Sequence, residues 1–266
     1  MATPEEWVDN YLHLTVPTLD VSASNGSPGG LVTGPDVRVP ITEYANASEA
    51  GYQAIRSLIR SELESWVRSP GHHIGRLLNG DHNHIEILVS PPLQTTMGTI
   101  FRVLDGKGAP EEIRDVLRLA SLWIATQPAA LQRQSVSDLQ TFADRYIGVD
   151  CNGYVGTYFQ HNQRVHYPTA EFFIPAIPAH TETRHQLSEV QELDLIVSHG
   201  WGHVSLVATV FARSDTEISC NECQSRSTHL HGVHTGRVTI RHGHNHFTIN
   251  GQPVTGIYGV RGLIQT

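Results

Sequence analysis

The chain has 266 residues, a formal net charge of -8 and a hydrophobic content of 39%. This composition is typical of a globular protein with a buried core and excludes a disordered chain. The negative charge argues against a nucleic acid partner, because binding to phosphates requires a basic surface.

Two further signals bear on location. No stretch reaches the roughly 20 apolar residues of a membrane helix, so we expect no membrane contact. The first residues, MATPEEW, lack the basic and apolar regions of a secretory signal. We therefore expect synthesis in the cytoplasm, with any export depending on a dedicated secretion system.

Residues 1–130 are predicted to form an N-terminal extension that is mostly helical and begins with an irregular arm. Residues 1–45 are rich in Pro, Gly, Ser and Thr, which favours extended chain with at most one short strand. Apolar residues recur at helical spacing over 47–68 and over 110–127. Short strands are expected over 85–89 and 99–103, and a third helix over 128–146.

Residues 131–266 are predicted to form a second domain, in which one helix precedes a series of strands. The helix is expected over 150–160, followed by a Pro-rich loop over 167–180. The later segments alternate apolar and polar residues between turns, as antiparallel sheets do. These strands are expected over 193–197, 204–211, 226–231, 236–241 and 246–250. Helices followed by strands predict an α+β fold.

Cys151 carries the strongest chemical signal, because it stands alone at the predicted start of a helix. A helix N-terminus and a nearby imidazolium both favour a thiolate, so this position suits a nucleophile. Asn152 and Gly153 follow and permit a substrate to approach the backbone closely, as an oxyanion site requires. The alternative interpretation is a small buried residue in an apolar helix, which is how many cysteines are used.

His203 supplies a partner of the right type. It follows Cys151 by 52 positions, is preceded by Gly202, and opens an apolar run that predicts a strand. A histidine can take the proton of a thiol and return it to a leaving group. We expect a third polar residue to orient its ring by accepting a hydrogen bond from the other ring nitrogen.

These motifs resemble those of the NlpC-type, papain-like cysteine peptidases of bacterial cell walls. Residues 150–155, DCNGYV, resemble the family's Asp-Cys-Ser-Gly-aromatic/aliphatic-Val signature, and residues 202–207, GHVSLV, resemble its Gly/Ser-His-Val-Gly-Ile-aliphatic strand. Residues 193–197, LDLIV, are similar to the Gly-Asp-Leu-Val strand before the catalytic His. The likeness covers roughly residues 135–242. Asn152 and Ser205 depart from the pattern, and Tyr146 is a stand-in for the tyrosine of the family's Tyr-x-Trp-Gly-Gly element.

The resemblance implies a papain-like core in which the helix bearing Cys151 packs on an antiparallel sheet. It implies a triad of Cys151, His203 and His231, with His229 as the alternate third member. Asn152, Gly153 and Tyr146 are then expected near the oxyanion or the substrate. Members of the family cleave amide bonds in peptidoglycan stem peptides. We therefore expect a peptide or peptidoglycan fragment as the partner and no cofactor.

A second hypothesis concerns metal. Cys220, Cys223, His229 and His231 supply two thiols and two imidazoles, a set that binds zinc tetrahedrally in many small sites. The pairs are separated by five residues, whereas the usual finger has about twelve. This set predicts, as the alternative, a zinc-stabilised protein-interaction module without catalysis. The two hypotheses conflict at His231, which cannot serve both.

Overall fold

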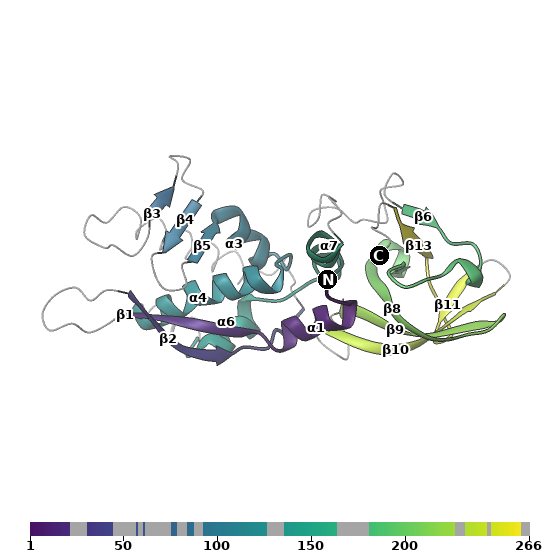
Figure 1. The fold of residues 1–266 in the computed structure, drawn as a ribbon, viewed down its shortest axis with the longest axis horizontal. Coiled ribbons are helices and arrows are strands. Elements are labelled where there is room, and N and C mark those ends of the chain that lie inside the picture. Colours follow the sequence, from purple (N-terminus) through teal and green to yellow (C-terminus); the bar gives the residue numbers. More distant parts are fainter. Residues whose placement is uncertain are drawn as a thin grey trace, which may run out of the picture. The chain divides into compact units, whose positions relative to one another are not determined.

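The chain forms two compact units that are described separately below (Figure 1). Unit 1 joins Met1–Tyr11 to Val149–Thr266, and unit 2 is Leu12–Gly148. These limits differ from the boundary predicted at residues 130 and 131. The structure, a computed structural model, describes residues 1–21, 31–44, 57, 61, 76–78, 84–87, 93–126, 136–163, 181–226, 232–243 and 246–261. None of the helices within these ranges combines the length and apolar character needed to cross a bilayer.

Unit 2 contains a hairpin, a small sheet and helices. Its elements are β1 (Thr15–Val21), β2 (Leu31–Arg38), β3 (Arg76–Leu78), β4 (His84–Ile87), β5 (Leu93–Thr96), α3 (Met97–Leu104), α4 (Pro110–Thr126) and α6 (Leu139–Tyr146). The β1–β2 hairpin and the β3-β4-β5 sheet are antiparallel. Helix α4 packs on β1, where Ser121 Oγ accepts from the Leu19 N–H at 2.7 Å. This buried bond ties the hairpin to the helix.

The N-terminal predictions have mixed outcomes. The predicted helix over 110–127 is confirmed as α4. The predicted strand over 99–103 is wrong, because Thr96 caps the helix α3 there by accepting from the Thr99 N–H. The irregular arm is also wrong within the described residues, which form α1 (Pro4–Leu12), β1 and β2. The predicted helix over 47–68 lies almost entirely outside the described residues.

Unit 1 combines helices with one antiparallel sheet, which confirms the α+β arrangement. Its elements are α7 (Cys151–Asn162), β6 (Thr181–Thr183), β7 (Leu195–Ser198), β8 (His203–Arg213), β9 (Glu217–Arg226), β10 (Gly232–His242), β11 (Phe247–Ile249), β12 (Gln252–Pro253) and β13 (Gly256–Val260), together with most of α1. The strand order is β12-β11-β10-β9-β8-β7-β13-β6. The last strand of the chain therefore returns to pair between β7 and β6.

More of the elements predicted for residues 131–266 are confirmed than of those predicted for residues 1–130. The helix from Cys151 and the strands near 193–197, 204–211, 236–241 and 246–250 correspond to α7, β7, β8, β10 and β11. Strand β9 was not predicted, because its CxxC was interpreted as part of a loop or zinc site. The predicted strand over 226–231 and the Pro-rich loop lie almost wholly outside the described residues.

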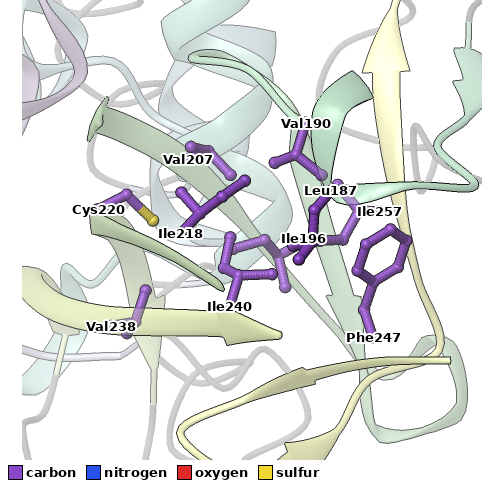
Figure 2. Packing of buried hydrophobic residues seen from close by; sticks show 10 residues of the cluster. All are labelled: Leu187, Val190, Ile196, Val207, Ile218, Cys220, Val238, Ile240, Phe247 and Ile257. Carbon is purple, nitrogen blue, oxygen red and sulfur yellow. The ribbon is translucent and has the colours of Figure 1, made fainter. Parts of the chain in front are cut away.

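The sheet of unit 1 curls around an apolar core. Side chains from β7 to β11 and from β13 meet in one buried cluster, which a flat sheet does not permit. Figure 2 shows these side chains pointing toward one another, with Phe247 and Ile257 opposite Val207 and Ile218. The cluster consists of Leu187, Val190, Ile196, Val207, Ile218, Cys220, Val238, Ile240, Phe247 and Ile257. This core holds the strands on which the candidate site is built.

Candidate functional site

Helix α7 begins at Cys151, as the sequence predicts, because Asp150 is a strong N-cap. Asp150 has extended backbone angles, and its Oδ1 accepts from the Gly153 N–H at 2.6 Å. Most side chains of α7 are buried, including the small ones at both its ends. Burial over most of its length fixes the position of the helix, so its first residue is held in place.

Residues 1–11 hold α7 from one side. The Tyr154 hydroxyl donates to the Pro4 carbonyl at 2.8 Å, and the hydroxyls of Tyr11 and Thr157 lie 3.0 Å apart. The rings of Trp7 and His161 stack with centroids 5.8 Å apart. These contacts join the start of the chain to the candidate nucleophile helix across about 150 positions. The segment was interpreted as an arm because its own sequence gives little sign of such a partner.

The sheet holds α7 from the other side. Helix α7 packs on β8 and β9, and Figure 1 shows it beside these strands. Ser225 Oγ of β9 donates a hydrogen bond to the Val149 carbonyl, just ahead of the helix. Farther along the helix, the side chains of Tyr154 and Cys223 interact. The N-terminal end of α7 is therefore attached to the sheet close to the last residues of β9.

His203 is the first residue of β8 and is buried, with 8% of its surface exposed. Its Nε2 lies 2.7 Å from Oε1 of Gln224 on the neighbouring strand β9. Burial lowers the pKa of His203 to about 4, and the bond to Gln224 opposes this shift. The imidazole is accordingly neutral at pH 7, with Nδ1 left as the basic nitrogen if Nε2 carries the proton.

A chain of buried polar side chains continues from His203. Gln224 Nε2 donates to Glu222 Oε2 at 3.2 Å, and Ser205 Oγ donates to Glu222 Oε1 at 2.5 Å. All four residues are buried. Burial raises the pKa of Glu222, and the bond from Ser205 opposes the rise. We call His203, Ser205, Glu222 and Gln224 the buried polar chain.

Strand register places the residues of the buried polar chain on one face of the sheet. Val207 pairs with Glu222, so alternation puts His203 and Ser205 on the face that also carries Val207. Ser225 and Cys223, which contact the α7 region, lie on the opposite face. His203 stands at the start of β8, at the level of the sheet where Ser225 holds the chain before α7. Strand alternation therefore places His203 on the face of the sheet opposite the residues that contact the α7 region, so the register alone does not bring the imidazole to the Cys151 thiol.

The turn before His203 is tight. His199 and Gly200 both have left-handed backbone angles, with φ of 53° and 60°. His199 Nε2 lies 3.1 Å from Arg226 Nη2, which donates to it. Arg226, His199 and His234 also lower the pKa of His203. A methyl group at Gly202 would lie 3.1 Å from the His199 carbonyl oxygen, so a small residue fits this turn best.

Of the three residues expected near an oxyanion, Asn152 and Gly153 lie at the start of α7, and Tyr146 lies in the other unit. The Gly153 N–H donates to Asp150 and is thereby engaged in capping the helix. Asn152 is buried beside Cys151 at the start of α7. Tyr146 belongs to unit 2, where its ring packs 5.3 Å from that of Phe142. That the Cys151 N–H serves as an oxyanion donor stays a prediction.

The prediction of His231, with His229 as the alternate, as the third member of the triad is not tested by the structure. His229 and His231 lie outside the described residues. Within the described part, the partner of His203 Nε2 is Gln224. A sequence signal for this pair is its spacing, since Glu222 and Gln224 are two residues apart, as side chains on one face of a strand are. The CxxC of Cys220 and Cys223 instead suggested a zinc site for this segment.

The two cysteines do not fit a shared zinc site. They are three residues apart in β9, which pairs without interruption with β10, so they point to opposite faces. Cys220 lies in the apolar cluster, and Cys223 lies 3.3 Å from the Thr235 hydroxyl. Burial raises the pKa of each thiol to about 12, which disfavours the thiolate that zinc binds. Among the described residues, no group of three or more His, Cys, Asp or Glu is arranged to hold a metal.

Comparisons with known proteins add nothing to this geometry: no family model, no curated protein and no solved structure matches the chain.

Proposed function

We propose that this chain is a cysteine hydrolase in which Cys151 is the nucleophile, His203 the general base and Gln224 the residue that orients His203. The observation that carries the proposal is the 2.7 Å contact between His203 Nε2 and Gln224 Oε1, inside a buried site on the strands that support α7. An acceptor at Nε2 leaves Nδ1 to receive a proton, as a general base requires. The start of a buried helix supplies the thiol in a fixed position.

The proposed reaction proceeds through an acyl-enzyme. This reaction requires His203, the first residue of β8, to reach Cys151 around the end of the sheet. Its Nδ1 then takes the proton of the Cys151 thiol as sulfur attacks the carbonyl carbon of an amide. The C–N bond then breaks, and His203 returns the proton to the leaving amine. Water, deprotonated by the same imidazole, hydrolyses the thioester and regenerates the thiol. Because burial favours neutral His203, the pair rests as thiol and imidazole, and the charges separate only during attack.

The substrate class follows from the resemblance of the two motifs. The sequences around Cys151 and His203 are similar to those of NlpC-type peptidases, which supports an amide in a peptidoglycan stem peptide or a related amide. A papain-like core is part of the same proposal. It is supported by the packing of α7 on the antiparallel strands that carry His203 and Gln224.

The first test uses thiol reactivity and needs no substrate. Iodoacetamide at pH 7 is expected to label Cys151 well before Cys220 and Cys223, whose pKa values are raised to about 12 by burial. His203→Ala should slow the labelling of Cys151, whereas His185→Ala, at an exposed position outside the site, should not. Equal labelling of all three cysteines, or no effect of His203→Ala, would contradict the proposal.

The second test identifies the reaction. Purified muropeptides are incubated with the protein, and the products are separated and weighed by mass spectrometry. We expect new fragments that differ from the substrate by hydrolysis of one amide bond, and none with Cys151→Ala. Cleavage that survives Cys151→Ala would assign the activity to other residues.

A further inference from the structure

A glutamine side chain can present either end to its neighbour, and the two choices have opposite effects on His203. If Gln224 Oε1 faces Nε2, that nitrogen carries the proton and Nδ1 is basic. If the Gln224 amide turns over, its NH2 group faces Nε2, and the proton moves to Nδ1. In the second arrangement His203 cannot accept the thiol proton at Nδ1. The orientation of one amide therefore decides whether the proposed base is competent.

Glu222 determines which end of the Gln224 amide faces His203. Its carboxylate has no proton to donate when ionised, so the end of Gln224 that faces it must be the NH2 group. Gln224 Nε2 is 3.2 Å from Glu222 Oε2, and this leaves Oε1 facing His203. Ser205 donates to the other carboxylate oxygen, so both oxygens receive hydrogen bonds and the carboxylate cannot rotate freely.

Burial raises the pKa of Glu222, and charged groups nearby oppose part of that rise. Arg226 on its own strand and His234 on β10 both lower the pKa of Glu222, which burial raises. Farther along the same face of β9 the next side chain is Cys220, in the apolar cluster. An apolar side chain at 222 would continue that cluster without the cost of burying a carboxylate, so packing alone gives no reason for an acid here.

We propose that Glu222 is a positioning residue, which holds the Gln224 amide in the one orientation that keeps His203 protonated on Nε2 and basic on Nδ1. The inference rests on the proposed function, because it assigns Glu222 a task in setting up the base of that same site. Its direct consequence, however, is the tautomer of His203, which is measurable without any substrate.

The experiment reads the tautomer by NMR. Long-range 1H–15N spectra of the 15N-labelled protein at pH 7 distinguish protonated from unprotonated ring nitrogens, and a spectrum of His203→Gln identifies the His203 signals. We expect a single Nε2–H tautomer in the wild type. Glu222→Gln should populate both tautomers and slow the labelling of Cys151 by about twofold or more. The control is Asn221→Ala on the opposite face of β9, which should leave the tautomer unchanged.

A swap variant keeps the inference testable if Glu222→Gln fails to fold. In Glu222→Gln/Gln224→Glu, a carboxylate at position 224 accepts from His203 Nε2 whichever way it turns, so the Nε2–H tautomer and the labelling rate should return to wild-type values. Failure of the folded swap variant to restore that tautomer contradicts the inference, as does an unchanged tautomer in folded Glu222→Gln.

The outcomes also separate this inference from the proposed function. If His203→Ala slows the labelling of Cys151 and Glu222→Gln changes neither the tautomer nor the labelling, the hydrolase proposal stands and the role of Glu222 is wrong. If Glu222→Gln changes the tautomer and His203→Ala leaves the labelling unchanged, Glu222 positions the ring but His203 is not the base of Cys151.

Discussion

Along one face of β9, Ile218 and Cys220 lie in the apolar cluster, whereas Glu222 and Gln224 belong to the buried polar chain. The backbone, the sheet and the degree of burial are alike in the two halves. The first half gains stability from removing apolar surface from water. The second half must recover the cost of burying polar groups through hydrogen bonds among themselves. The difference separates a half that stabilises the fold by apolar burial from a half whose buried polar groups depend on one another for hydrogen bonds.

The two halves should also respond differently when a substitution removes part of a side chain. A missing methyl group in the apolar half leaves a cavity whose cost depends on volume. A missing partner in the polar half leaves a donor or acceptor unpaired, and its neighbours then rearrange. The predictions below test this contrast by changing one half at a time and measuring both stability and the reactivity of Cys151.

The largest loss of stability is expected in the apolar half. Ile240 is fully buried and pairs across the sheet with Ile218. Ile240→Ala should lower the free energy of unfolding by about 2–5 kcal/mol, because it removes buried methyl groups and leaves a cavity. Urea denaturation measures the loss. Labelling of Cys151 in the folded variant should stay at the wild-type rate, and a large change in that rate would mean that the two halves are coupled.

The next effect depends on pH and on His203. Its pKa is about 4 in the folded state against an ordinary 6.5, so the unfolded chain takes up the proton first. The contribution of neutral His203 to the free energy of unfolding is fully present above pH 6.5. It is lost as the pH falls toward 4, and the loss is at most about 3 kcal/mol. The measurement is the difference in unfolding free energy between the wild type and His203→Gln, at pH 7.5 and pH 4.5.

The comparison with His203→Gln matters because other groups titrate in the same range. Burial raises the pKa of Glu222 and of Asp194, so each of them favours the folded state as the pH falls. Both carboxyls are present in the two proteins and largely cancel in the difference. If that difference does not change between the two pH values, His203 is not a buried neutral imidazole.

The elements that carry the candidate site were not equally predictable from the sequence. Cys151 and His203 were located correctly at the starts of α7 and β8, because an Asp N-cap and an alternating apolar run are local signals. Glu222 and Gln224 were not identified, since their role depends on which strand lies beside β8. Pairing is a long-range property, and the CxxC in the same strand suggested a different chemistry.

Other elements show the same limit. The helix α3 was predicted as a strand because Thr99, Ile100 and Val103 are β-branched, yet the Thr96 cap and burial on one side favour a helix. The helix α1 was missed because its stability comes from contacts with α7, such as the stacking of Trp7 on His161. Local sequence signals predicted the elements that have caps or clear alternation. The structure of the other elements depends on contacts with segments distant in the sequence.

A smaller loss of stability, with a larger effect on reactivity, is expected in the polar half. Gln224→Ala removes the acceptor of His203 Nε2 and leaves a buried N–H group without its partner. The free energy of unfolding should fall by about 1–3 kcal/mol. Labelling of Cys151 should slow markedly, because the ring is no longer oriented. Denaturation and labelling are measured on the same sample, and a variant that loses stability but labels at the wild-type rate would remove Gln224 from the site.

The smallest effect is expected at an exposed polar pair on the same strands. Arg241 donates to Glu217 at 2.9 Å, with 58% and 42% of their side chains exposed. Water already solvates both groups well, so Glu217→Gln should change the free energy of unfolding by less than about 1 kcal/mol, and high salt should remove the difference. Glu217 and Glu222 thus provide two glutamates on β9 that differ in burial. If Glu217→Gln costs as much as Gln224→Ala, burial does not set the value of these polar groups, and the distinction between the two halves of the strand loses its physical basis.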